Sequence, residues 1–361
     1  MDKVDHIQHI EDLLFTSQAD LVPQILRGIL KNIAGNRTIT HVSIKYDGSP
    51  SILAGNDPKD GQFFIATKSI FNKLPVVYKN FYELTQIKND GLRKAMMYAW
   101  DELSKERFEG IVQGDLLWTP DDLYHVGNTL RCRTNTLSYD LTDLHMLEPD
   151  KTVGIAWHTG YVGDSLKTLR VADRVFIPLS LMKVSNLVNV STYALVKDHF
   201  KPKPETELEY NQRIDFIEMN IANMPIMEEA VPHLKKFFAG GHEYVNSAFR
   251  PLLEKYVAAY YKDEFDARKS MNGKQRVKDE HYRVWDWMNK NIRLLWALHV
   301  AYNELVELKH DLITTYDSSA PLKAYLPNGY YTGQEGYVVK YRDVITKLVN
   351  REIFTIANRL N

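Results

Sequence analysis

Hydrophobic and polar residues alternate with a period of two in several parts of the chain, which predicts β-strands. One such stretch, 39–45, ends at Lys45. Two others flank the polar turn 55–61 and predict a hairpin that ends near Lys68. The run 152–158 is almost entirely small or apolar, so we expect it in the centre of a sheet. The remaining predicted strands cover 109–118, 130–139, 333–341 and 344–349.

A helical period dominates elsewhere. Apolar residues recur three and four positions apart along each predicted helix, most regularly between 277 and 311. The first predicted helix is expected to pack beneath the sheet that carries Lys45. The predicted helices cover 5–34, 89–106, 206–223, 227–238, 242–261 and 277–311.

Strands and helices fall into separate blocks, which predicts an α+β fold with a helical insertion. Residues 1–183 form the first part of a strand-containing core, 184–319 form an inserted helical subdomain, and 320–361 return to the core with strands and a short helix.

Composition narrows the class of protein. The 361 residues are 44% hydrophobic and 25% charged, typical of a globular protein. No apolar run is long enough to span a bilayer and no signal peptide is recognisable, so we expect no membrane partner. The single cysteine, Cys132, suits a reducing cytoplasm. The net charge of -1 means that any contact with a polynucleotide must come from a local basic patch.

The first candidate for chemistry is Lys45, which is followed by Asp47 and Gly48 at the end of a predicted strand. A lysine held there acts as a nucleophile when burial or neighbouring charge keeps part of it unprotonated. Asp-Gly is also a common turn sequence, so spacing alone leaves a purely structural turn open.

The order of later segments adds to this pattern. Lys45-Tyr46-Asp47-Gly48-Ser49 resembles the first motif of the covalent nucleotidyltransferases, the superfamily of ATP-dependent DNA and RNA ligases and mRNA capping enzymes. Further segments that resemble motifs of this superfamily follow in its order, at 66–69, 114–117, 153–158, 335–340 and 347–349. The resemblance implies a ligase-type core of antiparallel sheets with flanking helices.

The resemblance also implies roles for individual residues. Lys45 would form a lysyl-AMP intermediate with ATP, assisted by Mg²⁺ or Mn²⁺ at Asp47 and Glu335, while Lys347 would contact the phosphates. Nucleotide-binding positions would be Gly48, Lys68, Asp115, Trp157 and Lys340. Three of these positions have alternatives: Lys68 as a solvated lysine, Trp157 as a structural aromatic, and Asp115 as the partner of a lysine or of metal-bound water.

Two basic groups are candidates for contact with nucleic acid. Arg131 and Arg133 alternate on one predicted strand and so share a face, where they would hold phosphate or pair with acids across the sheet. The stretch 266–278 is predicted to be a basic loop, either bound to nucleic acid or simply solvated; its basic residues include Arg268, Lys269, Lys274 and Arg276.

The chain departs from the superfamily pattern in three ways. Val349 stands where a second lysine often follows the equivalent of Lys347, the helical part precedes Glu335, and the chain ends too soon after Lys347 for an OB-fold. The missing OB-fold argues against mRNA capping and a standard DNA ligase, and residues 45–49 resemble the motif of the RNA ligases more closely. The resemblance therefore implies transfer of AMP to the 5′-phosphate end of a nucleic acid, RNA rather than DNA.

Two other interpretations stay open. In the first, the protein is a nucleotidyltransferase that modifies a protein or a small molecule. In the second, it is a binding protein that has the same fold and no catalytic activity. The small core without an OB-fold favours a bacteriophage source and hence the host cytoplasm. The oligomeric state, and the choice between ATP and GTP, do not follow from the sequence.

Overall fold

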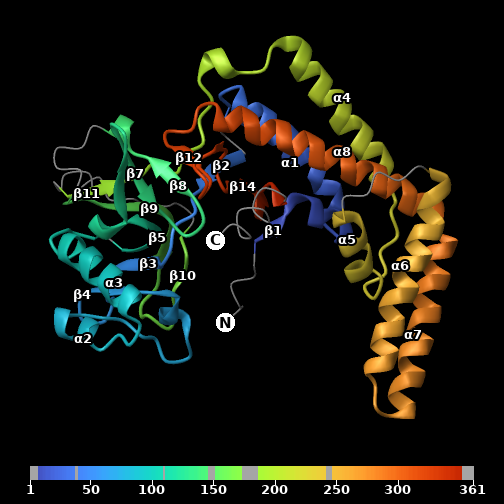
Figure 1. The fold of residues 1–361 in the computed structure, drawn as a ribbon, viewed down its shortest axis with the longest axis horizontal. Helices are drawn as coiled ribbons and strands as arrows, with labels where there is room; N and C mark the ends of the chain where they lie inside the picture. The colour runs from blue at the N-terminus through green and yellow to red at the C-terminus, as the bar shows by residue number, and fades with distance from the viewer. Residues whose placement is uncertain are drawn as a thin grey trace. The chain divides into compact units, whose positions relative to one another are not determined.

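The computed structural model describes residues 7–36, 40–108, 110–144, 151–172, 186–240 and 246–351. Figure 1 shows a mixed α and β protein, which confirms the predicted α+β class. The chain divides into two compact units. The strand-rich unit comprises 42–197, 316–338 and 349–361; the helical unit comprises 1–41, 198–315 and 339–348.

The larger sheet of the strand-rich unit has the order β10-β9-β5-β3-β4, and β11 pairs with β9. All neighbours are antiparallel except β11 and β9. The predicted hairpin is β3 and β4, and the apolar run at 152–158 lies in β9, inside the sheet as expected. The strands are β3 (Ser51–Asn56), β4 (Phe63–Ala66), β5 (Ile111–Trp118), β9 (Val153–Val162), β10 (Arg170–Val171) and β11 (Leu187–Asn189).

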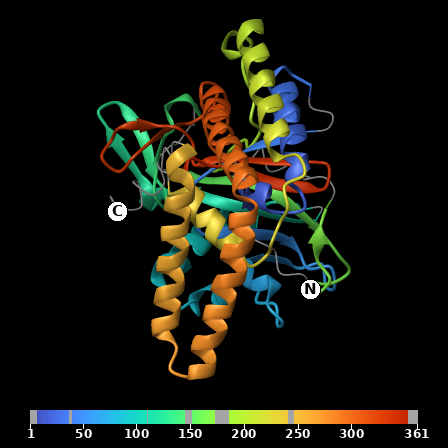
Figure 2. The same ribbon diagram turned by 90° about the vertical axis from the view of Figure 1, so that its right-hand side faces the viewer.

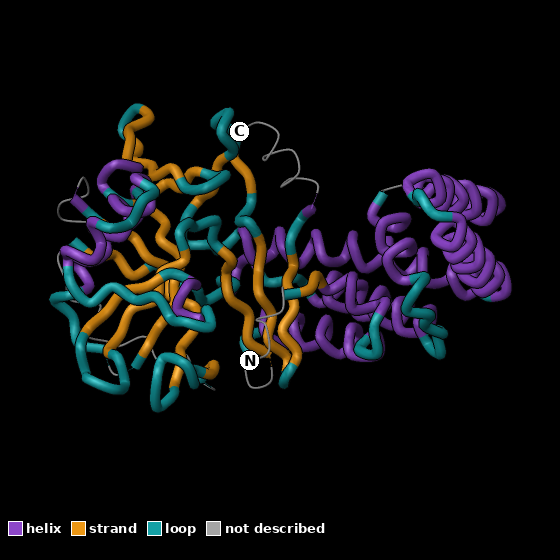
Figure 3. The backbone as a smooth tube through the Cα atoms, turned by 90° about the horizontal axis from the view of Figure 1, so that it is seen from below, coloured by secondary structure: helices purple, strands orange, loops and turns teal. Residues whose placement is uncertain are grey.

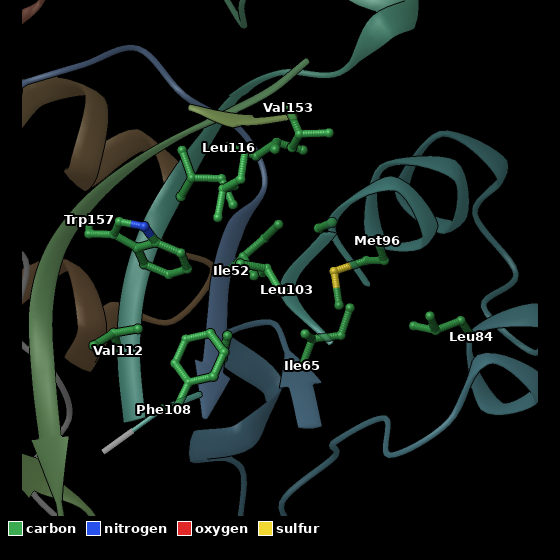
Figure 4. Close-up of a cluster of buried hydrophobic side chains, with 14 of the residues drawn as sticks. Ile52, Ile65, Leu84, Met96, Leu103, Phe108, Val112, Leu116, Val153 and Trp157 are labelled. Atoms are coloured by element: carbon green, nitrogen blue, oxygen red, sulfur yellow. The ribbon is translucent and has the colours of Figure 1, made fainter. Parts of the chain in front are cut away.

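Helix α3 (Asp90–Leu103) covers one face of this sheet. Asn89 caps the helix by accepting a hydrogen bond from the backbone of Leu92, and its apolar side packs on the strands. Figure 4 shows this core, to which α3 contributes Met96 and Leu103 and the strands contribute residues such as Ile52 and Trp157. Two short helices, η3 (Lys68–Phe71) and α2 (Phe81–Thr85), precede α3.

A second sheet of the strand-rich unit has the order β13-β12-β8-β7-β6. Its described neighbours are all antiparallel. The stretch 130–139, predicted as one strand, forms two strands joined by the loop 134–137. The strands are β6 (Leu123–Val126), β7 (Thr129–Arg133), β8 (Ser138–Asp140), β12 (Lys323–Tyr325) and β13 (Tyr331–Thr332); short helices η4 (Pro120–Asp122) and η5 (Thr142–Leu144) flank them. Figure 3 shows the strands of the molecule in orange and its helices in purple.

The helical unit is built around a cluster of aromatic side chains. Phe238 contacts the rings of Phe15, Phe249 and Tyr302 at centroid distances of 5.5 to 6.4 Å. Its helices are α1 (Val22–Ile33), α4 (Pro204–Ile221), α5 (Val231–Ala239), α6 (Asn246–Ala267), α7 (Met271–Lys290) and α8 (Ile292–Asp317), with η1 (Ile10–Phe15), η2 (Ala19–Leu21) and η8 (Asp198–Phe200).

Three predictions about helices need correction. The helix predicted for 5–34 is divided into η1, η2 and α1. Its main part, α1, packs on the sheet that carries Lys45, as expected: the Asn32 amide donates to the backbone oxygen of Thr40, in the strand predicted at 39–45. On another side, Arg27 of α1 pairs with Asp215 and Glu218 of α4. The single helix predicted for 277–311 is two helices, because the chain leaves helical geometry at Asn291 (φ -103°, ψ 15°). The helical spacing of apolar residues continues across Asn291, so the sequence pattern gave no sign that the helix ends there.

The third correction concerns the predicted basic loop. Only residues 268–270 connect α6 and α7, and the hairpin of these two helices is visible in Figure 2. Ser270 begins α7 by accepting a hydrogen bond from the backbone of Gly273. Lys274 and Arg276 are therefore helical. Arg268 pairs with Glu264 at 2.7 Å, and the Lys274 amine lies 4.9 Å from the ring of Phe265.

The predicted strands 39–45, 333–341 and 344–349 belong to a third sheet, of order β1-β15-β14-β2. Strands β2 and β14 each contain residues of both units. The sheet comprises β1 (Gln8–His9), β2 (Thr40–Lys45), β14 (Gly336–Tyr341) and β15 (Val344–Leu348). Among the described helices, none combines the length and the apolar character needed to cross a membrane.

Candidate active site

Lys45 ends strand β2, and its amine forms an ion pair with the carboxylate of Glu335. The two residues are 290 positions apart, and both belong to the strand-rich unit. Glu335 follows β13 and directly precedes β14. The Lys45 side chain is 33% exposed and that of Glu335 is 16% exposed, so the amine is oriented by a partner and still open to a small molecule.

Asp47 has a different environment, because its carboxylate is buried and holds the loop 134–137. It accepts hydrogen bonds from the backbone N–H groups of Thr136 and Leu137 and from the Thr134 hydroxyl. A buried carboxylate needs such donors. The oxygens of Asp47 are thus occupied by the protein, and this residue shapes the site rather than facing an open space.

Gly48 allows strand β5 to approach the lysine loop. A Cβ at this position would lie 2.7 Å from the Cβ of Asp115 and 3.0 Å from the backbone oxygen of Leu116. The backbone of Ser49 also donates a hydrogen bond to that oxygen. Glycine is therefore required here for close packing, which brings Asp115 to the same site.

Asp115 lies on β5, and its carboxylate is 3.6 Å from Nε2 of His158 on β9. The side chains are 28% and 31% exposed, respectively. The other ring nitrogen of His158, Nδ1, is 2.7 Å from the hydroxyl of Thr159. Sequence reasoning missed His158. The available signal was a polar residue directly after the apolar run 153–157, at the place where pairing with β5 becomes irregular.

Burial and neighbouring charges together set the pKa of Glu335. Burial raises the pKa of Glu335, and the nearby charges of Asp47 and Asp115 raise it further, whereas the ion pair with Lys45 lowers it; the net effect is upward. Burial also raises the pKa of Tyr139, whose hydroxyl oxygen accepts a hydrogen bond from the backbone N–H of Asp47 at 3.0 Å. A carboxylate with a raised pKa is a better proton acceptor than an ordinary one.

Trp157 requires a correction. Its indole is fully buried in the core beneath α3 (Figure 4). Its N–H donates to the side-chain oxygen of Asn189 at 2.7 Å. In this structure it is a core residue and has no exposed ring face for a purine. The sequence alternative, a structural aromatic, describes it correctly.

The remaining nucleotide-binding candidates are spread over both units. Lys68 is exposed and begins η3, at the same end of the β3–β4 hairpin as Ser51, because Ala66 pairs with Leu53. Lys340 is exposed on β14, and Lys347 is half-buried on β15, beside His9 in the strand register. The last two belong to the helical unit.

The candidates for nucleic-acid contact also divide between the units. Arg131 and Arg133 lie on β7 of the strand-rich unit, where Arg131 stacks on Tyr325 and Arg133 lies over Tyr124. No ion pair joins either arginine to an acid among the described residues. The second group, Arg268, Lys269, Lys274 and Arg276, lies at the α6–α7 connection in the helical unit.

Together these features define a mixed α and β protein with a half-exposed lysine held by a carboxylate, next to an aspartate–histidine pair. Within the described part of the chain, no group of three or more His, Cys, Asp or Glu side chains has the geometry to hold a metal ion. The chain belongs to a family of unknown function, DUF6267, which it matches over residues 4–360. No curated protein and no solved structure matches it.

Proposed function

We propose that this protein is an ATP-dependent covalent nucleotidyltransferase in which Lys45 carries AMP. One observation carries the proposal: the Lys45 amine is paired with Glu335, although 290 residues separate them. Asp115, from a third segment, is close enough to raise the pKa of Glu335. The three residues come from segments that resemble three motifs of the superfamily.

The chemistry follows from this arrangement. The Lys45 nitrogen attacks the α-phosphorus of ATP, the P–N bond forms, the bond to the bridging oxygen breaks, and pyrophosphate leaves. The amine must first lose a proton, which passes to the Glu335 carboxylate. The raised pKa of Glu335 favours this transfer. In a second step an oxygen of the acceptor attacks the same phosphorus, and the lysine amine departs.

The residues present also suit a divalent cation. Glu335 and Asp115 offer partly exposed carboxylate oxygens of the kind that Mg²⁺ prefers, whereas the oxygens of Asp47 already accept hydrogen bonds from the loop 134–137. We therefore assign the metal-binding role to Asp115 rather than to Asp47, because Glu335 takes up the Lys45 proton in this mechanism. When bound, the cation would supply positive charge to the phosphates. The contact of Lys340 and Lys347 with the phosphates of the nucleotide remains a prediction.

The acceptor proposed is the 5′-phosphate end of a nucleic acid, RNA rather than DNA. The two arginines on β7 support a nucleic-acid acceptor, since they make no ion pair with an acid among the described residues and belong to the same unit as Lys45. The choice of RNA rests on the resemblance of residues 45–49 to the motif of the RNA ligases. Sealing would then follow when a 3′-hydroxyl displaces AMP from the activated end.

Incubation of the purified protein with α-³²P-labelled ATP and Mg²⁺ tests the first step. We expect a labelled protein band whose bond is labile to acid and stable to alkali, as a phosphoramidate is. Lys45→Ala should remove the label completely. Lys88→Ala, which changes an exposed lysine of the same unit, is the matched control and should keep it. Label that persists in Lys45→Ala would refute the mechanism.

A chase identifies the acceptor. The labelled protein is mixed with 5′-phosphorylated RNA, the same sequence as DNA, or a cell extract without nucleic acid. Label should move to the RNA and, to a smaller extent, to the DNA. Movement of label to protein in the extract would assign the enzyme to protein modification instead.

A further inference from the structure

The second sheet of the strand-rich unit has two chemically different faces. Its inner face is buried and includes Cys132, Tyr139 and Ala324, which lie side by side in the strand register. Residues that alternate with these point to the opposite face. That face is rich in tyrosine and basic residues, which we call the tyrosine–arginine face: Tyr124, Arg131, Arg133, Lys323, Tyr325 and Tyr331.

The rings and guanidinium groups of this face stack on one another. The guanidinium carbon of Arg131 lies 3.6 Å from the ring centroid of Tyr325, and that of Arg133 lies 5.6 Å from the ring of Tyr124. The rings of Tyr325 and Tyr331 are 6.0 Å apart and almost perpendicular. Tyr331 remains 61% exposed, so one aromatic ring is open to solvent beside an ordered row of others.

The face is also positively charged. Arg131, Arg133 and Lys323 contribute three cations, and the acid in their strand register is Asp140, which lies opposite both Arg131 and Lys323. One oxygen of Asp140 accepts a hydrogen bond from the backbone of Thr142. The buried Nε of Arg131 has no hydrogen-bond partner among the described residues. Cations in excess of acids favour a polyanion.

We propose that the tyrosine–arginine face binds single-stranded nucleic acid. Exposed aromatic rings on a sheet offer stacking surfaces for unpaired bases, and neighbouring arginines and lysines contact the phosphates. In a duplex the bases are stacked on one another and cannot stack on the tyrosine rings, so a duplex should bind this face more weakly. Five strands about 4.8 Å apart span roughly 20 Å, enough for a few nucleotides.

The chain connects this face to the lysine site at two places. Strand β7 leads directly into the loop 134–137, which holds Asp47, and β13 ends three residues before Glu335. A nucleic-acid strand bound to this face would therefore lie on the same unit as Lys45. This delivery role rests on the proposed function, whereas binding itself does not.

Fluorescence anisotropy with a fluorescein-labelled 12-nucleotide RNA, and with DNA of the same sequence, tests the proposal on the full chain without ATP or Mg²⁺. We expect the single strands to bind at least about tenfold more tightly than a blunt duplex of equal length. The logarithm of affinity should fall with the logarithm of salt concentration with a slope near about -2, as three phosphate contacts on a single strand imply.

Variants separate stacking from charge. Tyr331→Ala should weaken binding about tenfold, because it removes an exposed ring, whereas Tyr331→Phe should keep wild-type affinity. Tyr82→Ala removes another exposed tyrosine of the same unit, away from this sheet, and should change nothing. Equal binding of duplex and single strand, or a Tyr331→Ala variant that binds like Tyr82→Ala, would overturn the proposal. Failure of ATP labelling would leave this binding intact and would count only against the enzymatic function.

Discussion

Two lysine–glutamate pairs in this protein have the same chemistry and very different surroundings. In the helical unit, Lys309 of α8 donates to Glu11 of η1 at 2.7 Å, and the side chains are only 4% and 1% exposed. In the strand-rich unit, Lys45 pairs with Glu335 at 33% and 16% exposure. In the second pair, the charges of Asp47 and Asp115 raise the pKa of Glu335.

The comparison separates a structural ion pair from a reactive one. A fully buried pair holds elements together, and breaking it is costly because one charge is left without solvent. A half-exposed pair contributes little to stability. An amine that is oriented, close to a proton acceptor and accessible to a substrate is suited to nucleophilic chemistry instead. The difference between the pairs therefore lies in their surroundings and not in the residue types.

The largest expected effect is the difference in stability between variants that lack Lys309 and variants that lack Lys45. Lys309→Met is expected to lower the free energy of unfolding by about 3–5 kcal/mol, because Glu11 is left buried without its cation. Lys45→Met should cost less than about 1 kcal/mol. Urea denaturation of both variants measures the difference. The double variant Glu11→Leu/Lys309→Met should recover most of the loss, and failure to recover would show that packing, not charge, causes it.

A second prediction distinguishes the aspartates around Lys45. Asp47→Asn should destabilise the protein by about 2 kcal/mol, because an amide cannot accept all the hydrogen bonds from Thr136, Leu137 and Thr134. Asp115→Asn should cost less than about 1 kcal/mol, because Asp115 is partly exposed. Denaturation combined with ATP labelling tests this. Asp115→Asn should reduce labelling in a protein of near-normal stability. If Asp115→Asn instead destabilised the protein and Asp47→Asn reduced labelling without loss of stability, Asp115 would be the structural residue and Asp47 the one that acts in the site.

The third prediction concerns the close approach at Gly48. Gly48→Ala should destabilise the protein by about 1–3 kcal/mol, because the new methyl group would clash with Asp115 and with the backbone of Leu116. Gly91→Ala is the matched control, since the nearest atom to its added Cβ is 3.5 Å away, within the first turn of α3. Thermal unfolding should show a lower Tm for the first variant only. Equal Tm values would mean that β5 can move away from the lysine loop without cost.

The smallest effect is on pH dependence. The raised pKa of Glu335 means that folding favours its protonated form, so its contribution to stability is present at low pH and is lost as pH rises through the raised pKa. Glu335→Gln removes this titration. The stability of the wild type relative to Glu335→Gln should therefore decrease as pH rises from the ordinary carboxylate value of 4.5. A difference that grows with pH would show instead that the ion pair with Lys45 dominates.

Local sequence patterns predicted most of the elements but few of their partners. The strands around Lys45, the hairpin β3–β4 and helix α3 follow from alternation, turn residues and an apolar stripe, all of which act over a few positions. The break at Asn291 was not predictable because one apolar stripe continues through both helices. The contact of α1 with α4 depends on ion pairs between Arg27 and two acids about 190 residues later in the chain. No local sequence pattern encodes such a contact.

The candidate site shows the same division. Motif order predicted that Lys45 and Glu335 matter, and their contact agrees with that prediction. The sequence did not reveal that Asp47 holds a loop, that Trp157 is buried, or that His158 faces Asp115. The environments of Trp157 and His158 depend on which side of β9 faces the core, and a bulge between β5 and β9 alters that side locally. The role of Asp47 depends on the loop 134–137, whose backbone donors Thr136 and Leu137 are 89 and 90 positions away.

The most direct test of the account is to locate a nucleotide on the chain. Wild-type protein is incubated with ATP and Mg²⁺, digested under alkaline conditions and analysed by mass spectrometry. The account predicts AMP on the peptide that contains Lys45 and none on the peptide that contains Lys309. AMP on another residue, or no adduct at all under conditions in which the protein is folded, would contradict it.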